Sequence, residues 1–191
     1  MPLTLNSNSL ALVSSTSGSV EEKNPWKFIE KLTASGDTTL DFTNSAISNH
    51  KSLFIYFDGL DKSNQTNTIM NMYLDGSLNV NSYYSNSMLN MTGSNRNGSG
   101  SGSMTYWEIG GVNYTWYHNI TGGMYISGVE SGSYKSFKSE LSGGTSNATQ
   151  NMSAAGFYNQ TSSKITGIQI RPASGTFLSG AVHLYGLNEH D

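Results

Sequence analysis

Alternation of apolar and polar residues, interrupted by turns, constrains this chain more than any other feature. Residues 164–187 give the clearest case: Ile168 and Ile170 alternate with polar residues, a turn containing Pro and Gly follows, and Val182 and Leu184 alternate again. The segment predicts a closing hairpin. No window of helical length carries apolar residues at i, i+3, i+4 and i+7 together with caps. The sequence therefore predicts an all-β fold, an antiparallel two-sheet sandwich that is jelly-roll-like.

Three further segments refine this prediction. Residues 26–42 contain two alternating runs around a Gly and Asp turn and predict the first hairpin. The run 53–60 is apolar on both faces, which favours a central strand covered on both sides. The tract 93–103 is rich in Gly and Ser and predicts a flexible loop.

The domain organisation follows from where these patterns begin. Residues 1–24 are rich in Ser and Asn, have little periodicity, and are expected to form an extended arm before a single sandwich domain at 25–191. The arm is either a disordered terminus or an assembly segment that orders on a neighbouring subunit. In the second interpretation, its docking residues are Leu3, Leu5, Leu10, Leu12 and Val13.

Composition excludes several classes of function. Charged residues make up only 12% of the 191 residues and the formal net charge is -3, so no basic surface for nucleic acid is expected. Cysteine is absent, which excludes a disulfide scaffold and a thiolate metal site. The N-terminus lacks the basic region and apolar run of a secretory signal, and no apolar run approaches the roughly 20 residues of a membrane span, so membrane insertion is not expected.

No residue pattern indicates catalysis. A glycosidase needs two carboxylates at a defined separation, but Glu108, Glu130 and Glu140 fall on separate predicted strands or turns. The histidines show neither the His-x-His nor the His-Glu-x-x-His spacing of a metal site. They are His50, His118, His183 and His190. We therefore predict no catalytic residues, no metal and no cofactor.

One aromatic constellation suits a ligand. Exposed aromatic rings stack on sugars, while Asn and Ser side chains supply neutral hydrogen bonds. The candidate ligand-binding residues are Tyr106, Trp107, Tyr114, Trp116 and Tyr117. The alternative is that these rings fill the sandwich core or a subunit interface.

Three segments carry a resemblance to a known family. They are the opening with Trp26 and the run Ala-Ser-Gly-x-x-x-x-Asp-Phe that ends at Phe42, the central run 53–60, and the ending Ile-x-Ile-x-Pro-x-Ser-Gly-x-x-x-Ser-Gly-x-x-x-Leu-Tyr-Gly-Leu at 168–187. In this order the chain resembles a large, loosely related group of small structural proteins of tailed-bacteriophage virions. The resemblance brackets residues 26–187 and transfers no binding residues.

The resemblance implies a non-enzymatic virion protein made in the host cytoplasm. It would decorate the capsid or belong to the tail or a fibre, with other virion proteins as partners. The apolar residues of the arm and the low charge predict a homo-oligomer, with a trimer favoured. The alternative function is a receptor- or carbohydrate-binding module, an adhesin, that recognises host-surface glycans through surface aromatics.

Overall fold

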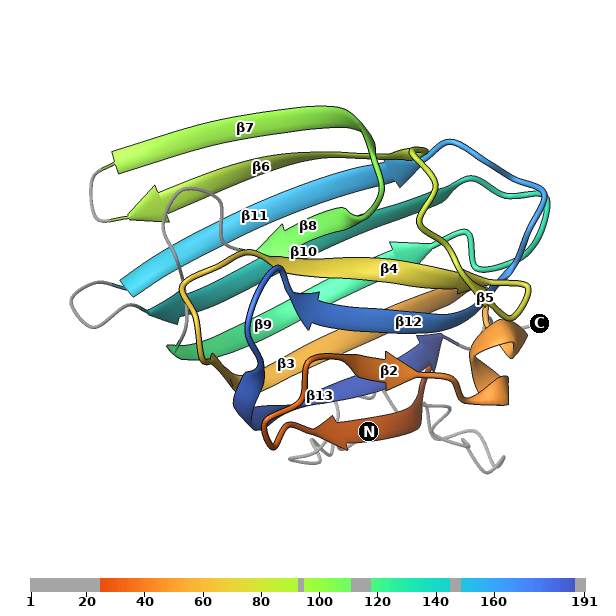
Figure 1. Cartoon of the computed structure of the whole chain (residues 1–191). Coiled ribbons are helices and arrows are strands. Elements are labelled where there is room, and N and C mark those ends of the chain that lie inside the picture. The colour runs from red at the N-terminus through yellow and green to blue at the C-terminus, as the bar shows by residue number, and fades with distance from the viewer. Residues whose placement is uncertain (1–24, 93–94, 111–117, 145–148, 188–191) are drawn as a thin grey trace, which may run out of the picture.

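The protein is an antiparallel β-sandwich. The computed structural model describes residues 25–92, 95–110, 118–144 and 149–187. Two sheets pack face to face, with the smaller sheet in front of part of the larger one in Figure 1. This arrangement confirms the two-sheet sandwich expected from the alternating pattern.

The large sheet has eight strands, and every pairing in it is antiparallel. In spatial order, the strands are β1 (Trp26–Thr33), β13 (Phe177–Leu187), β3 (Ser52–Lys62), β9 (His118–Ser127), β10 (Lys135–Gly144), β11 (Thr149–Tyr158), β6 (Tyr84–Thr92) and β7 (Asn95–Met104).

The small sheet lies over one face of the large sheet and closes the core. Its strands in spatial order are β2 (Leu40–Phe42), β12 (Ile165–Pro172), β4 (Thr68–Leu74) and β5 (Ser77–Leu78), and β8 (Trp107–Gly110) also pairs with β4. A short 3-10 helix, η1 (Ser45–Asn49), follows β2 and begins where the Asn44 side chain accepts a hydrogen bond from the Ala46 N–H.

The predictions of a hairpin at residues 26–42 and of a closing hairpin at residues 164–187 are both wrong. Strand β1 pairs with β13 in the large sheet, whereas β2 pairs with β12 in the small sheet. Strands β12 and β13 are likewise in different sheets. In each case the turn carries the chain from one layer to the other, because the apolar faces of successive strands are buried against each other instead of side by side.

The Gly- and Ser-rich tract is also not a loop in its described part. It forms β7, which pairs with β6 at one edge of the large sheet with partners such as Leu89 and Gly98. Glycine and serine have low intrinsic strand preference, so backbone hydrogen bonds to β6 determine the conformation here.

The core is a single cluster of buried side chains drawn from both sheets. At one end, Tyr84 packs edge-on against Trp107 at 5.3 Å between ring centroids, and Trp107 packs against Phe137 at 4.9 Å. The buried polar ends of these rings are paired: Trp107 Nε1 donates to the Phe157 carbonyl, and the Tyr84 hydroxyl donates to the Asn79 carbonyl. Burial raises the pKa of Tyr84 to about 12, so the hydroxyl remains a donor at neutral pH.

Candidate functional site

A row of aromatic side chains crosses the outer face of the large sheet, the face that the small sheet does not cover. The register places Phe28 of β1 opposite Tyr185 of β13, Tyr185 opposite Phe54 of β3, and Phe54 opposite Tyr125 of β9. Directly opposed residues on neighbouring strands point to the same face. Four rings from four separate segments are therefore brought together by strand pairing alone.

Two more rings complete the surface. We call the following residues the aromatic patch: Trp26, Phe28, Phe54, Tyr56, Tyr125 and Tyr185. Trp26 packs against Tyr125 at 5.3 Å and against Phe54 at 5.6 Å between ring centroids. Phe28 is 53% exposed, Tyr125 43% and Tyr56 36%. All members except Phe28 line an open depression of about 420 Å³.

Backbone features explain why the rings fit. A Cβ on Gly123 would lie 2.7 Å from the Phe54 ring, so glycine is what leaves room for that ring beside β9. A register shift between Phe28 and Glu30 changes the alternation of β1. Trp26 and Phe28 therefore lie in the patch while Leu32 packs against the core.

Polar groups lie at one margin of the patch. The ring of His183 lies 6.0 Å from that of Tyr56, and its Nε2 lies 3.7 Å from an Asp58 carboxylate oxygen. The Asp58 side chain is 57% exposed. The patch is thus an apolar surface with an exposed carboxylate at its edge, a combination typical of surfaces that bind a partner.

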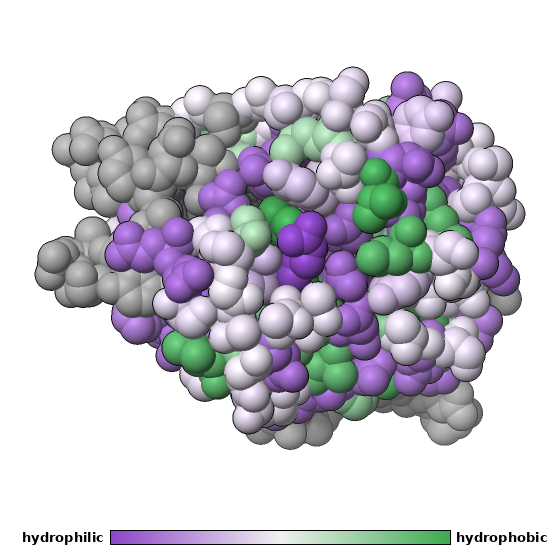
Figure 2. Space-filling view, viewed as in Figure 1, coloured by the Kyte–Doolittle hydropathy of each residue, from purple (hydrophilic) through white to green (hydrophobic). Residues whose placement is uncertain are grey.

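The opposite face of the molecule is more polar than the aromatic patch. Figure 2 shows the side toward the viewer in Figure 1 as mainly hydrophilic or weakly polar, with small separate hydrophobic areas. On this side the small sheet carries a polar ladder in which Tyr73 and Gln169 both donate to an Asp41 carboxylate oxygen, at 2.7 and 2.8 Å. Burial tends to raise the pKa of Asp41, but its hydrogen bonds prevail and lower it.

The structure corrects part of the predicted aromatic site. Trp107 is fully buried in the core and cannot stack on a ligand, as the alternative core interpretation holds for this residue. Tyr106 is half-buried beside it. Tyr114, Trp116 and Tyr117 lie outside the described residues, as do the arm residues Leu3, Leu5, Leu10, Leu12 and Val13.

The three glutamates belong to different segments, with Glu108 on β8, Glu130 between β9 and β10, and Glu140 on β10. Glu108 accepts a hydrogen bond from the Asn67 amide, and Glu140 accepts one from the Ser153 hydroxyl. His50 is buried against Gly186, and His190 lies outside the described residues.

Among the residues that the structure describes, no group of three or more His, Asp or Glu side chains could hold a metal ion. Within the same ranges, no helix has the length and apolar character needed to cross a bilayer.

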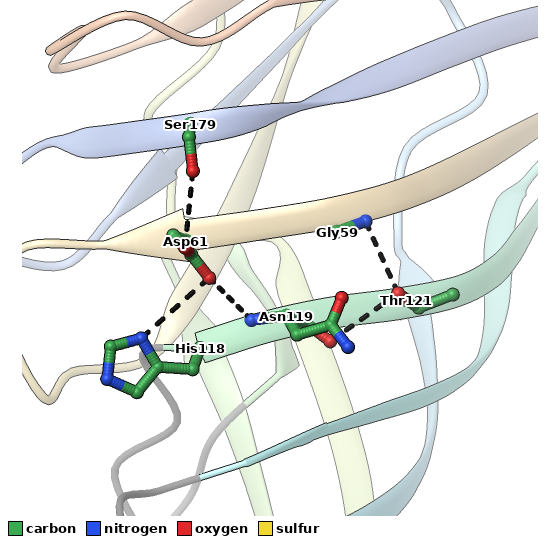
Figure 3. A network of polar contacts seen from close by, with 6 residues as sticks. All are labelled: Gly59, Asp61, His118, Asn119, Thr121 and Ser179. Carbon is green, nitrogen blue, oxygen red and sulfur yellow. Dashed lines mark hydrogen bonds and ion pairs between the residues drawn. The ribbon is translucent and has the colours of Figure 1, made fainter.

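Asp61 organises a polar network where β3 ends and where β9 and β13 begin (Figure 3). Its carboxylate accepts the Asn119 N–H at 2.6 Å and the Ser179 hydroxyl at 3.2 Å, and it lies 3.8 Å from Nδ1 of His118. Asn119 has a positive φ of 51°, in the left-handed region that Asn tolerates. All three strands are irregular here, so we assign the network a structural role in fixing their bulges.

Within the part of the chain that the structure describes, Lys62 and Lys135 are buried, and no carboxylate is in hydrogen-bond contact with either ammonium group. Lys62 donates to the Thr66 carbonyl and to Thr68 Oγ1, and burial lowers its pKa to about 7. Lys135 donates to the carbonyls of Glu130 and Ser133, and burial lowers its pKa as well. The Lys62 ammonium bonds to the turn after β3 and to the first residue of β4, and the Lys135 ammonium bonds to two carbonyls of the segment before β10. The sequence pattern did not reveal either arrangement.

The aromatic patch was missed at the sequence level for a specific reason. The run 53–60 is apolar on both faces, a pattern that predicts burial on both sides. In the structure one face is core and the other, with Phe54 and Tyr56, is the patch.

No protein-family model, curated protein or solved structure matches the chain.

Proposed function

We propose that this protein is a non-enzymatic structural component of a tailed-bacteriophage particle. It attaches to a larger surface of the virion, as a capsid decoration or as part of the tail or a fibre. The order of the three sequence segments between residues 26 and 187 supports this assignment by resemblance. The proposal includes synthesis in the host cytoplasm, other virion proteins as partners, and a homo-oligomer with a trimer as the favoured state.

The aromatic patch is the structural observation that carries the proposal. Clustered exposed rings on a sheet face that no other described strand covers are typical of protein interfaces, where Trp, Tyr and Phe are enriched. Residues 1–24 join the domain at Pro25, and the next residue, Trp26, is itself part of the patch. Pro25, the residue at which the proposed assembly arm joins the domain, is therefore the chain neighbour of a patch residue.

The test compares incorporation of variants into particles. Phe28→Ser combined with Tyr125→Ser removes two exposed rings without opening the core. We expect this variant to remain folded and to be incorporated at least about tenfold less than wild type, since buried aromatic anchors dominate interface energies. Leu178→Ser is the matched control, because Leu178 is 50% exposed on β13 and lies outside the patch. Normal incorporation of the patch variant would overturn the proposed role of the patch.

Deletion of residues 1–24 provides a separate test of the arm. We expect the remaining chain to fold and to be lost from particles. Light scattering should show an oligomer for the full chain; a monomer over a wide concentration range would contradict the proposed trimer.

A second candidate function is binding of host glycans. It is favoured by a different observation, a neutral polar pocket at the rim of the sandwich, away from the residues of the aromatic patch.

A further inference from the structure

A pocket of about 310 Å³ lies at the rim of the sandwich, where the chain passes from the small sheet to the large one. We call it the rim pocket. Its walls come from the end of β4, from β5, from residues 79–83, and from the end of β11 with residues 160–163. The residues used below are Asn79, Asn81, Tyr83, Tyr158 and Gln160.

The inner wall of the rim pocket is held in place by hydrogen bonds. Asn79 donates its amide N–H to the Tyr158 hydroxyl at 2.6 Å and accepts the Asn81 N–H at 3.1 Å. The Asn79 carbonyl accepts from the Asn71 amide at 3.0 Å. Asn79 and Tyr158 are both buried, so this inner wall is ordered in the protein without a ligand.

Tyr83 supplies an aromatic surface at the mouth. Its ring stands edge-on to Tyr158, with centroids 6.0 Å apart, and is 45% exposed. Its backbone is fixed on both sides, because its N–H donates to the Asn81 carbonyl and its carbonyl accepts the Asn159 N–H. A preorganised, half-exposed ring can stack on the C–H face of a ligand at little entropic cost.

The chemistry of the lining narrows the class of ligand. Every lining residue is uncharged, and the polar ones are amides and hydroxyls. Asp75 is not among the lining residues, and its carboxylate accepts the Lys164 N–H at 3.3 Å. Among the described residues that line the pocket, a phosphate or carboxylate ligand would find no cation and a cationic ligand no carboxylate, whereas amide groups donate to and accept from hydroxyls equally well.

We propose that the rim pocket binds one neutral saccharide unit. The sugar ring stacks on Tyr83, and its hydroxyl groups bond to the side chains of Asn81 and Gln160. The volume lies at the lower end of small-molecule sites, which suits a mono- or disaccharide. For a ligand of that size, we expect a Kd of about 1 mM at a single isolated site. This inference deepens the second candidate function and does not depend on the virion assignment.

Titration of the full chain with a sugar panel tests the proposal. The panel contains glucose, galactose, mannose, N-acetylglucosamine, maltose and lactose, with sialic acid and glucose 6-phosphate as charged comparators. Saturation-transfer NMR and chemical-shift titration should show saturable binding of at least one neutral sugar, more tightly than either comparator. Absence of saturable binding across the neutral panel, or tighter binding of a charged comparator, would overturn the proposal.

Variants locate the binding. Tyr83→Ala should lower the affinity for the bound sugar at least about tenfold, and Tyr83→Phe should keep the wild-type affinity, because the ring face makes the contact. Gln160→Ala provides a second weakening variant at a separate wall. Tyr134→Ala is the matched control, since Tyr134 is 57% exposed and does not line the pocket. Equal binding by wild type, Tyr83→Ala and Gln160→Ala would refute the site.

Failure of this inference and failure of the virion proposal are distinguishable. Tyr83→Ala should enter particles normally, and the Phe28→Ser, Tyr125→Ser variant should bind the sugar normally, because the two surfaces share no residue.

Discussion

The buried ammonium group of Lys62 should make the stability of the fold depend on pH. The side chain is 1% exposed, and burial lowers its pKa from 10.5 to about 7. In the unfolded chain the same group keeps its ordinary pKa. Between pH 7 and about 10.5 the unfolded state therefore binds more protons than the folded state, and the free energy of unfolding rises with pH.

The magnitude follows from the two pKa values. Each pH unit well inside this window contributes at most about 1.4 kcal/mol, and the slope falls as pH approaches 7, where the folded group is half protonated. Summed from pH 7 to pH 9, the contribution of Lys62 is about 2 kcal/mol of added stability. Below pH 7 both states become protonated, so the contribution levels off.

Urea unfolding of wild type and Lys62→Met at pH 7 and pH 9 measures this effect. Methionine has a similar length and cannot titrate, so the wild type should gain about 2 kcal/mol more than the variant between the two pH values. Lys138→Met is the control, because the Lys138 side chain is 69% exposed. An equal pH response of wild type and Lys62→Met would refute the reasoning, whatever the absolute stability of the variant.

Two further predictions concern the packing of the large sheet. Gly123→Ala places a Cβ 2.7 Å from the Phe54 ring and should cost about 1–3 kcal/mol in thermal unfolding, whereas Gly102→Ala, where a Cβ meets nothing within 4 Å, should cost much less. Asp61→Ala removes the acceptor of the Asn119 N–H and should cost about 1–3 kcal/mol in urea unfolding. The exposed Asp58→Ala should change stability by no more than about 0.5 kcal/mol, and equal losses for the two aspartates would contradict the role of the Asp61 network.

The layer architecture was predictable because alternation reports which residues face the core. Strand β3 shows the limit of that signal. Its outer residues Phe54 and Tyr56 are large aromatic residues that also occur in cores, and the pattern alone does not say whether a second layer covers them. The patch depends on partners in β1, β9 and β13, which are far apart in sequence and meet only through strand pairing.

Strand partners were the least predictable feature. The turn at 34–37 has the composition of a hairpin turn, yet it leads from β1 in the large sheet to β2 in the small one. Local turn chemistry specifies that the chain reverses, whereas long-range packing decides which sheet the next strand joins. The Gly- and Ser-rich β7 shows the same effect, since its pairing with β6 overrides weak local preference.

Immunogold electron microscopy tests the proposed role most directly. The sample is particles purified from a lysate in which the genome encoding this chain is expressed, labelled with an antibody against the folded domain. We expect gold on intact particles, over the head for a decoration protein or over the tail and fibres for a tail component. Unlabelled particles, under conditions where the antibody labels a particle displaying the domain as a fusion, would contradict the virion assignment.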